Sequence, residues 1–175
     1  MAESVRVMIS EAEVAKRIEE MGRQISEDYA GKQIHLICIL KGGVFFMCEL
    51  AKRISVPVSM DFMSVGSYGD GTTSSGVVRI AKDLDESLEG KDVLVVEDII
   101  DSGRTLYYLL DVLKKRGPES MKLCTLLDKP DRRVRDVKVD YVGFEIPDEF
   151  VVGYGLDYAQ KYRNLPYIGI VDGIE

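Results

Sequence analysis

The sequence is poor in the side chains that many metal sites and nucleophilic sites require. Its 175 residues include one histidine, His35, no tryptophan, and three cysteines, Cys38, Cys48 and Cys124. An odd number of cysteines without a C-x-x-C pair argues against a disulfide framework and a structural zinc site, so we expect reduced core thiols. A Ser-His or Cys-His mechanism would depend on His35, which begins an apolar run and better suits a structural role.

An excess of positive charge and a long apolar run are also missing. The net charge of -7 and the pI near 4.9 argue against nonspecific nucleic-acid binding, so an anionic substrate would need local positive groups. No apolar run approaches the ~18 residues of a membrane span, and the first residues have no secretory hydrophobic region. We therefore expect a cytoplasmic protein with no nucleic-acid partner and no membrane partner.

Apolar runs alternate with helical patterns along most of the chain. Ser10 and Glu13 form a capping-box pattern before a helical stripe that reaches about Tyr29. The patterns predict an α/β fold in one domain, residues 1–175: a parallel-sheet core flanked by helices, with a small hood subdomain from the N-terminal helix region and residues about 129–175. We expect helices at 10–29, 44–54 and 105–116, and strands at 34–40, 58–65, 76–82, 93–96, 121–127, 137–144, 150–154 and 167–171.

The segment V-L-V-V-E-D-I-I-D-S-G-R-T, residues 93–105, joins an apolar run to three acids and a small-residue turn. The run is typical of a buried parallel strand, and the turn opens a helix. In open α/β sheets, ligands bind beyond the carboxyl ends of the strands, where free N–H groups at a helix N-terminus hold anions. Since Glu97, Asp98 and Asp101 are good acceptors for a diol, one site could hold a phosphate and a sugar. Alternatively, the three acids form a solvated turn that complements the helix dipole.

This segment resembles the signature of the type I phosphoribosyltransferases, and specifically of the hypoxanthine-guanine branch. The resemblance implies a loop around the 5-phosphate of phosphoribosyl pyrophosphate, with Glu97 and Asp98 reaching the ribose hydroxyls. It also implies that Asp101 is the catalytic residue, as general base at N7 of the purine or as stabiliser of the proton there. The residues that it assigns to phosphoribosyl pyrophosphate are Lys41, Gly42, Glu97, Asp98, Asp101, Ser102, Gly103, Arg104, Thr105 and Arg163.

The segment L-K-G-G, residues 40–43, resembles the family's pyrophosphate loop, in which backbone amides and Lys41 face the leaving group. In the family, the peptide before the first glycine can be cis. Arg163, in Y-R-N-L-P, matches an arginine that contacts pyrophosphate, a role that suits a bidentate guanidinium. Without the resemblance, the first segment reads as an ordinary βα turn and Arg163 as a surface arginine.

Two further segments resemble the family's purine pocket. Lys129, in L-L-D-K-P-D-R-R-V, matches the lysine that donates to O6 and so selects 6-oxopurines over adenine, and Arg133 matches an accompanying arginine. In the segment F-E-I-P-D-E-F-V-V-G-Y-G-L-D-Y, Phe150 would stack on the purine and Val151 would use its backbone groups on the N1/C2 edge. Asp157 would orient a metal-bound water or the C2 substituent. Without the resemblance, Lys129 reads as a loop lysine and Phe150 as a core residue.

Ser67 and Tyr68, in S-Y-G-D-G-T-T-S-S-G, match a long flexible loop that in the family closes over the site and excludes water. The resemblance also implies Mg²⁺ as the cofactor, with Glu97, Asp98 and Asp157 as the metal residues. A P-loop search finds glycines at the required spacing here, but two valines follow where Lys and Ser or Thr are needed, which argues against an ATPase.

The implied reaction is purine salvage, in which phosphoribose moves from phosphoribosyl pyrophosphate to N9 of hypoxanthine or guanine. The sequence does not rank hypoxanthine, guanine and xanthine as substrates. The resemblance implies a homodimer or homotetramer, the assemblies that are common in the family. One alternative is an RNA-binding protein that keeps the fold, against which the acidic balance argues. Another is a phosphoacceptor receiver-like domain, which needs an acidic pair near the end of the first strand, where residues 36–41 have none.

Overall fold

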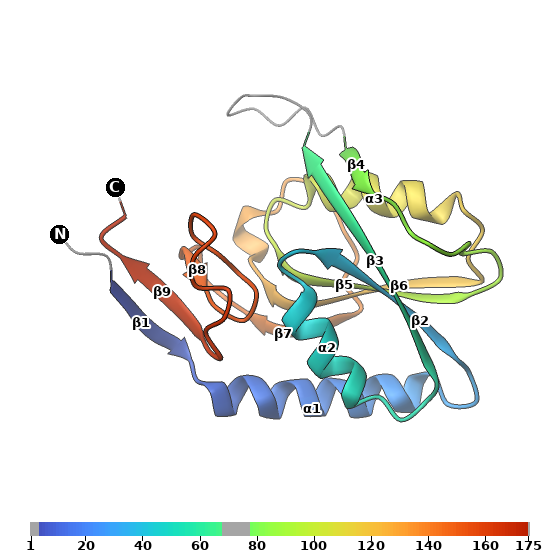
Figure 1. Ribbon diagram of the computed structural model, residues 1–175, viewed down its shortest axis with the longest axis horizontal. Helices are drawn as coiled ribbons and strands as arrows, with labels where there is room; N and C mark the ends of the chain where they lie inside the picture. The colour runs from blue at the N-terminus through green and yellow to red at the C-terminus, as the bar shows by residue number, and fades with distance from the viewer. Residues whose placement is uncertain (1–3, 68–77, 175) are drawn as a thin grey trace.

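The chain folds into a six-stranded core sheet and a three-stranded hood sheet (Figure 1). The computed structural model describes residues 4–67 and 78–174. The core sheet has the order β4-β3-β2-β5-β6-β7; β4, at one edge, is antiparallel to β3, and the other neighbouring pairs are parallel. The strands of the core sheet are β2 (Ile34–Leu40), β3 (Val58–Ser67), β4 (Val78–Lys82), β5 (Asp92–Ile100), β6 (Ser120–Asp128) and β7 (Tyr141–Glu145).

Helices cover both faces of the core sheet (Figure 1). The helices α1 (Glu11–Asp28) and α2 (Val44–Lys52) pack on one face, and α3 (Arg104–Lys114) packs on the other. Because both faces are buried, successive residues of β5 enter opposite cores: Val96 packs with α1 and α2, and Val95 packs with α3. The predicted α/β fold with a parallel-sheet core flanked by helices is therefore confirmed.

Helix α1 begins as its sequence pattern predicts. The Glu13 N–H donates to Ser10 Oγ at 3.2 Å, and the Ser10 N–H donates to Glu13 Oε1 at 3.2 Å, which completes the capping box. The helix ends at Asp28, one residue before the expected limit. One stripe of its surface is buried against the core sheet, and its side chains are Val14, Ile18, Met21 and Ile25.

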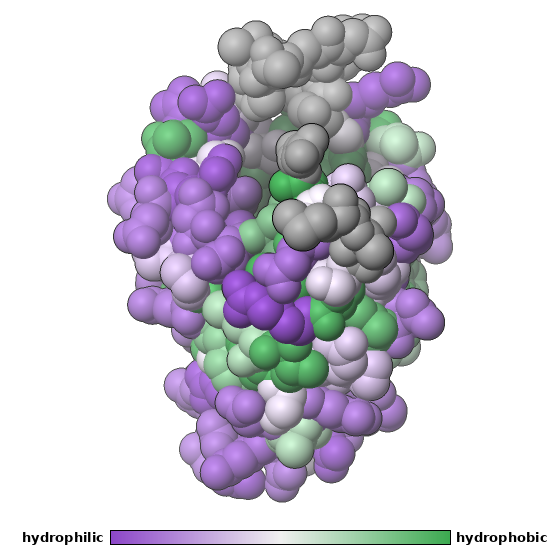
Figure 2. Space-filling view, turned by 90° about the vertical axis from the view of Figure 1, so that its left-hand side faces the viewer, coloured by the Kyte–Doolittle hydropathy of each residue, from purple (hydrophilic) through white to green (hydrophobic). Residues whose placement is uncertain are grey.

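The hood sheet lies beside one end of the core sheet (Figure 1). It consists of β1 (Ser4–Ile9), β9 (Ile168–Asp172) and β8 (Val151–Val152), in that order, with antiparallel pairing. Strand β1 is absent from the expected strands, because its six residues have neither a turn signal before them nor a strict alternation. Figure 2 views the molecule from this end and shows hydrophobic surface below the centre of the face, with hydrophilic residues around it.

The buried side of α2 differs from the prediction, which placed Cys48 in the core. Cys48 is exposed, and Phe46 and Leu50 are buried in its place. Because the first half of this helix is apolar all round, periodicity does not select its buried face, and contact with β2 and β5 does. Cys38 and Cys124 are buried and free, as predicted.

The segment after β6 has less regular structure than expected. The strand predicted at 137–144 begins only at Tyr141, and Val137 instead packs in the core beside α3.

Helix α2 ends at Lys52, before the predicted limit of 54. Of the helices that the structure describes, none combines the length and the apolar character that crossing a membrane requires.

Candidate functional site

The turn between β5 and α3 lies at the carboxyl end of the central strand. Gly103 precedes the helix with φ +77°, a left-handed conformation that favours glycine, and it provides no side-chain cap. The start of α3 borders a hollow of about 160 Å³, lined by Glu97 and residues 99–106, and the Arg104 N–H there donates to Ser102 Oγ at 3.3 Å. A helix N-terminus beside a hollow of this size suits a phosphate group.

The segment after β6 supports this turn from behind. The backbone N–H groups of Val134 and Arg135 donate to the carbonyl of Ser102 at 2.9 and 3.2 Å. A Cβ at Gly103 would stand 3.0 Å from Arg133 Cδ and 3.1 Å from the Arg135 carbonyl oxygen. The turn is therefore fixed by a segment about 30 residues later in the chain, which sequence patterns do not reveal.

Glu97 and Asp98 place two carboxyl groups beside the turn. Burial raises the pKa of Glu97 well above its ordinary value, and the neighbouring charge of Asp98 adds to the increase. Burial also raises the pKa of Asp98, although its Oδ1 accepts a hydrogen bond from the Ile99 N–H at 2.7 Å. Two crowded carboxyl groups of this kind gain from hydroxyl donors or from a cation, because either one relieves their repulsion.

The turn after β2 contacts the same acids. A Cβ at Gly42 would overlap the Asp98 carboxylate, so the two residues are in close contact. Lys41 is exposed at this turn. The Leu40–Lys41 peptide is cis, one peptide earlier than the bond before Gly42 where the family resemblance places it. The predicted pyrophosphate loop and the predicted ribose acids are thus neighbours in space.

Arg163 completes this side of the site from the hood. Its Nη1 donates to the Gly155 carbonyl at 2.7 Å, and its Nη2 lies 3.3 Å from Asp157 Oδ1. A Cβ at Gly155 would overlap the Gly42 carbonyl, which places Arg163 close to the turn after β2. Arg163 Nε is buried and has no hydrogen-bond partner among the described residues. The guanidinium is therefore held in place by Gly155, Asp157 and Gln160, while its Nε–H has no partner among the described residues.

The residues predicted to bind the purine lie along the other side of the site. Lys129 is buried directly after β6, and its Nζ is 3.7 Å from Asp148 Oδ1. Phe150 is half exposed, and its ring meets the Tyr158 ring edge-on at 5.7 Å. Val151 is buried in β8, where it pairs with a residue of β9. The segment from Asp148 to Val151 therefore brings together an acid that pairs with Lys129 and a half-exposed aromatic ring.

Asp101 has two arginine partners from the segment after Lys129. Its carboxylate Oδ1 lies 2.7 Å from Arg132 Nε, and its carbonyl accepts a hydrogen bond from Arg133 Nε at 3.3 Å. Arg132 ends the short 3-10 helix η1 (Pro130–Arg132), and Arg133 also pairs with Asp128. The sequence reasoning named Arg133 but not Arg132, Asp148 or Tyr158. The doubled arginine after K-P-D was the available signal for Arg132.

Some expected features lie outside this geometry. Ser67 ends β3, but its side chain and Tyr68 are not among the described residues. The described residues contain no group of three or more His, Cys, Asp or Glu side chains arranged to hold a metal ion. Asp157 is paired with Arg163 and accepts a hydrogen bond from the Gln160 N–H at 2.8 Å. A cation at Glu97 and Asp98 would therefore take its other ligands from a bound substrate or from water.

His35 lies at the other end of the core sheet. It pairs with Val93 near the start of β5, is buried, and has Nδ1 2.7 Å from Ser59 Oγ. Burial lowers the pKa of the imidazole, and the nearby charge of Lys91 adds to the decrease. This position separates His35 from the turn before α3 by the length of a strand.

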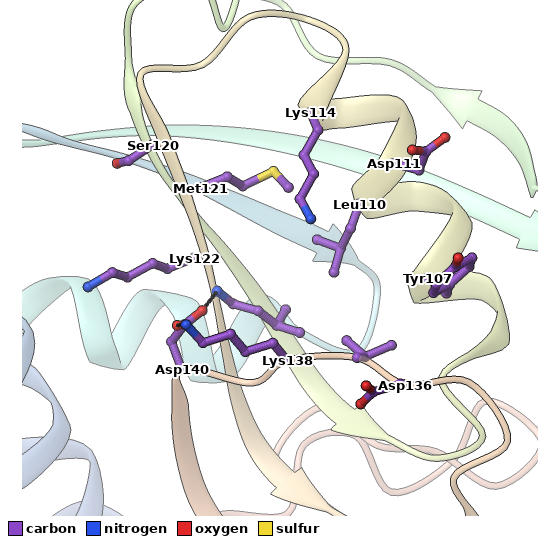
Figure 3. Close-up of a pocket in the computed structure, with 12 residues that line it drawn as sticks. Tyr107, Leu110, Asp111, Lys114, Ser120, Met121, Lys122, Asp136, Lys138 and Asp140 are labelled. Atoms are coloured by element: carbon purple, nitrogen blue, oxygen red, sulfur yellow. Dashed lines mark hydrogen bonds and ion pairs between the residues drawn. The ribbon is translucent and has the colours of Figure 1, made fainter.

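A larger cavity lies outside the site, between α3, the start of β6 and residues 136–140 (Figure 3). Its volume is about 360 Å³. Lys114 points into it from the last turn of α3, whereas the carboxylate of Asp140 is occupied by Lys138 and the Leu123 N–H. The hollow at the turn before α3 is smaller, but it lies at the start of a helix and is lined by the acids Glu97 and Asp101.

Comparison with known proteins agrees with this geometry. Residues 9–159 match the model of the phosphoribosyl transferase domain. The matched residues include the turn before α3 and the two acids beside it, Glu97 and Asp98, at the carboxyl end of β5. The chain belongs to the phosphoribosyltransferase family.

Its relatives place it more narrowly. It is 54% identical over 166 residues to the hypoxanthine-guanine phosphoribosyltransferase of Bacillus subtilis, covering 95% of this chain and 92% of that protein. It is 54% identical over 173 residues to the hypoxanthine phosphoribosyltransferase of Escherichia coli, covering 98% and 97%. The crystal structure of a hypoxanthine phosphoribosyltransferase from Staphylococcus aureus superimposes with a TM-score of 0.92 at 50% identity, covering 95% of this chain and 90% of that one. Within the family, the chain belongs to the hypoxanthine-guanine branch.

Some relatives are much longer. The bifunctional protein TilS/HprT of Listeria monocytogenes is 57% identical over 166 residues, and this chain spans about a quarter of its length, 26%.

Proposed function

We propose that this chain transfers the 5-phosphoribosyl group from phosphoribosyl pyrophosphate to N9 of hypoxanthine, guanine or both. The products are IMP or GMP and pyrophosphate, which makes the reaction one of purine salvage. The observation that carries this proposal is the meeting of the turn before α3, the acid pair Glu97 and Asp98, and Arg163 at one edge of the core sheet. The names of the relatives, hypoxanthine-guanine and hypoxanthine phosphoribosyltransferase, support the choice of substrates.

Phosphoribosyl pyrophosphate binds along the first side of the site in this proposal. Residues 102–105 hold the 5-phosphate through backbone N–H groups and hydroxyls, because they line the hollow at the N-terminus of α3. Glu97 and Asp98 accept hydrogen bonds from the ribose hydroxyls. The backbone at residues 41–42, with the Lys41 ammonium, and the free donor of Arg163 hold the pyrophosphate.

Mg²⁺ fits the donor set beside this turn. Carboxylate oxygens are the ligands that this cation prefers, and a cation relieves the crowding that raises the pKa of Glu97 and of Asp98. When bound, Mg²⁺ neutralises charge on the leaving pyrophosphate. Asp157, which is paired with Arg163, would orient a water on a bound cation or the C2 substituent of the purine.

The purine binds along the second side. Phe150 stacks on the ring, because one face of its side chain is exposed while Tyr158 supports its edge. Lys129 donates a hydrogen bond to O6; the amino group that adenine has at this position cannot accept that bond. The backbone groups of Val151 contact the N1/C2 edge. Asp101 takes or stabilises the proton at N7 as N9 attacks the ribose. Positioning and fixed charges provide most of the acceleration.

We also propose a homodimer or homotetramer in the cytoplasm. Phe45 of α2 is 43% exposed and Met60 of β3 is 52% exposed, so large apolar side chains are left on the surface of α2 and of β3. The three cysteines are free, as expected in a reducing compartment. Sedimentation of the wild-type chain and of Phe45→Ser checks the assembly: a lower mass for the variant supports this surface, and an unchanged oligomer contradicts it.

A spectrophotometric assay of each purine base with phosphoribosyl pyrophosphate and Mg²⁺ tests the proposed reaction. We expect nucleotide formation with hypoxanthine, guanine or both, none with adenine, and loss of the rate when EDTA removes the cation. Absence of any reaction with the 6-oxopurines would refute the proposal. Salt-dependent RNA retention on a filter would favour the binding-protein alternative instead.

A further inference from the structure

Four side chains of alternating charge link the two ends of the proposed purine edge. The Asp101 carboxylate lies 2.7 Å from Arg132 Nε, and Arg132 Nη1 lies 3.3 Å from Asp148 Oδ2. Asp148 Oδ1 in turn lies 3.7 Å from Lys129 Nζ. The order is therefore acid, base, acid, base, with Arg132 and Asp148 in the middle.

The ends of this series face neighbouring atoms of one ligand, if the proposed function holds. N7, the partner of Asp101, and O6, the partner of Lys129, lie on the same edge of a 6-oxopurine. A free carboxylate and a free ammonium so close together would attract each other and would close the space that the purine needs. Arg132 and Asp148 give each of them another partner, so that Asp101 and Lys129 stay apart.

The geometry of Arg132 suits this task. Its guanidinium uses Nε for one carboxylate and Nη1 for the other, so a single rigid fork spans both acids. The backbone fixes its starting point, because Arg132 ends η1 and its N–H donates to the Lys129 carbonyl at 3.1 Å. A lysine has one ammonium group and cannot keep this two-pronged geometry.

We infer that Arg132 is a positioning residue: it holds the proton-accepting carboxylate of Asp101 directly, and through Asp148 it holds the O6-donating ammonium of Lys129, so that both groups are placed for the purine. This inference rests on the proposed function. Arg132 itself touches neither substrate. Its loss frees the Asp101 carboxylate to rotate and leaves Asp148 with Lys129 as its only partner in the series.

The test compares Arg132→Gln with the control Arg23→Gln. Arg23 is an exposed arginine of α1 that is likewise ion-paired, in its case with a single carboxylate, that of Glu19 at 3.6 Å. Both are assayed for kcat and for the KM of hypoxanthine, of guanine and of phosphoribosyl pyrophosphate. Because the three side chains other than Lys129 are about half exposed, we expect Arg132→Gln to lower kcat/KM for the bases by about 2- to 10-fold. The KM for phosphoribosyl pyrophosphate and all constants of Arg23→Gln should stay at wild-type values.

Two more variants separate positioning from a general loss of structure. Arg132→Lys should recover only part of the rate, because it can meet one acid but not both. Arg132→Gln combined with Asp148→Asn should be no worse than the more damaging single variant, because both break the same link. Equal constants for Arg132→Gln and Arg23→Gln, additive losses in the double variant, or an equal rise in the KM of both substrates would each overturn the inference.

The two proposals fail in different ways. A wild-type chain that forms no nucleotide would overturn the proposed function and this inference together. An active wild-type chain in which Arg132→Gln behaves as the control would overturn the inference alone.

Discussion

The two sides of the site are built by different means. The side proposed for phosphoribosyl pyrophosphate is centred on one segment, from Glu97 to Thr105, to which the turn after β2 and Arg163 are added, and much of its recognition comes from the backbone. The side proposed for the purine uses side chains from several segments, held by ion pairs such as Arg132 with Asp148. A turn tolerates little change in shape, whereas an ion-paired cluster depends on which groups carry charge. The predictions below separate these two dependences.

The largest effect should come from Asp101→Asn. Since an amide cannot accept the N7 proton, we expect turnover to fall by about 10²- to 10⁴-fold while the KM for phosphoribosyl pyrophosphate stays nearly constant. Steady-state kinetics with hypoxanthine measure both constants. Asp131→Asn, an exposed neighbour in η1, is the control and should have wild-type turnover. Turnover that does not change in Asp101→Asn would reject the proposed role.

Lys129→Ala should weaken the purine side selectively. Loss of a charged donor to O6 is expected to raise the KM for 6-oxopurines by about 10- to 100-fold, with a much smaller change for phosphoribosyl pyrophosphate. The same kinetic assay, run with each substrate varied in turn, shows the difference. If both KM values rise together, the lysine serves the fold and not the base.

Gly103→Ala should damage the other side through shape alone. The residue has φ +77°, and the new Cβ meets the Arg133 side chain and the Arg135 carbonyl at 3.0 and 3.1 Å, so we expect a cost of about 1–3 kcal/mol and a KM for phosphoribosyl pyrophosphate raised at least about fivefold. Gly31→Ala is the matched control, because Gly31 has φ +78° but no heavy atom within 4 Å of a new Cβ. Denaturant unfolding and kinetics of both variants isolate the crowding. Equal behaviour of the two would show that the turn has room to adjust.

The smallest effect concerns stability and pH. In Glu97 and Asp98 the folded pKa lies above the ordinary values of 4.5 and 3.8, so the folded chain keeps protons that the unfolded chain has lost. The free energy of unfolding should therefore fall as pH rises from those values through the higher folded pKa values. Glu97→Gln with Asp98→Asn should remove this fall and raise the unfolding free energy near pH 8 by about 0.5–2 kcal/mol.

Urea unfolding of the ligand-free protein at several pH values provides this measurement, with Glu19→Gln on α1 as a surface control. The same double variant should lose activity, since it removes the acceptors for the ribose hydroxyls. A variant that is less stable than the wild type near pH 8 would show that the two carboxyl groups are not crowded.

The parts of the molecule that the sequence predicts well are local. The capping box of α1, its buried stripe, and the strand, acids and turn around Glu97 each depend on residues within a few positions of one another. Such patterns follow directly from helix and strand periodicity. The resemblance then supplied roles for residues that periodicity leaves unassigned.

The parts that escaped prediction depend on distant contacts. Strand β1 exists because β9, more than 150 residues later, pairs with it, and Cys48 is exposed because the core sheet selects another face of α2. The pairing of Arg132 with Asp101 and Asp148 likewise requires the fold. Surface ion pairs of this kind have no periodic signal, since any exposed loop is rich in charge.

The contact between Gly155 and Gly42 has a mechanical consequence. Two backbones from the hood and the core touch there with no side chain between them that could compress or swing aside. Neither segment can shift far without displacing the other. A movement of the hood at Gly155 would therefore be coupled to a movement of the turn after β2.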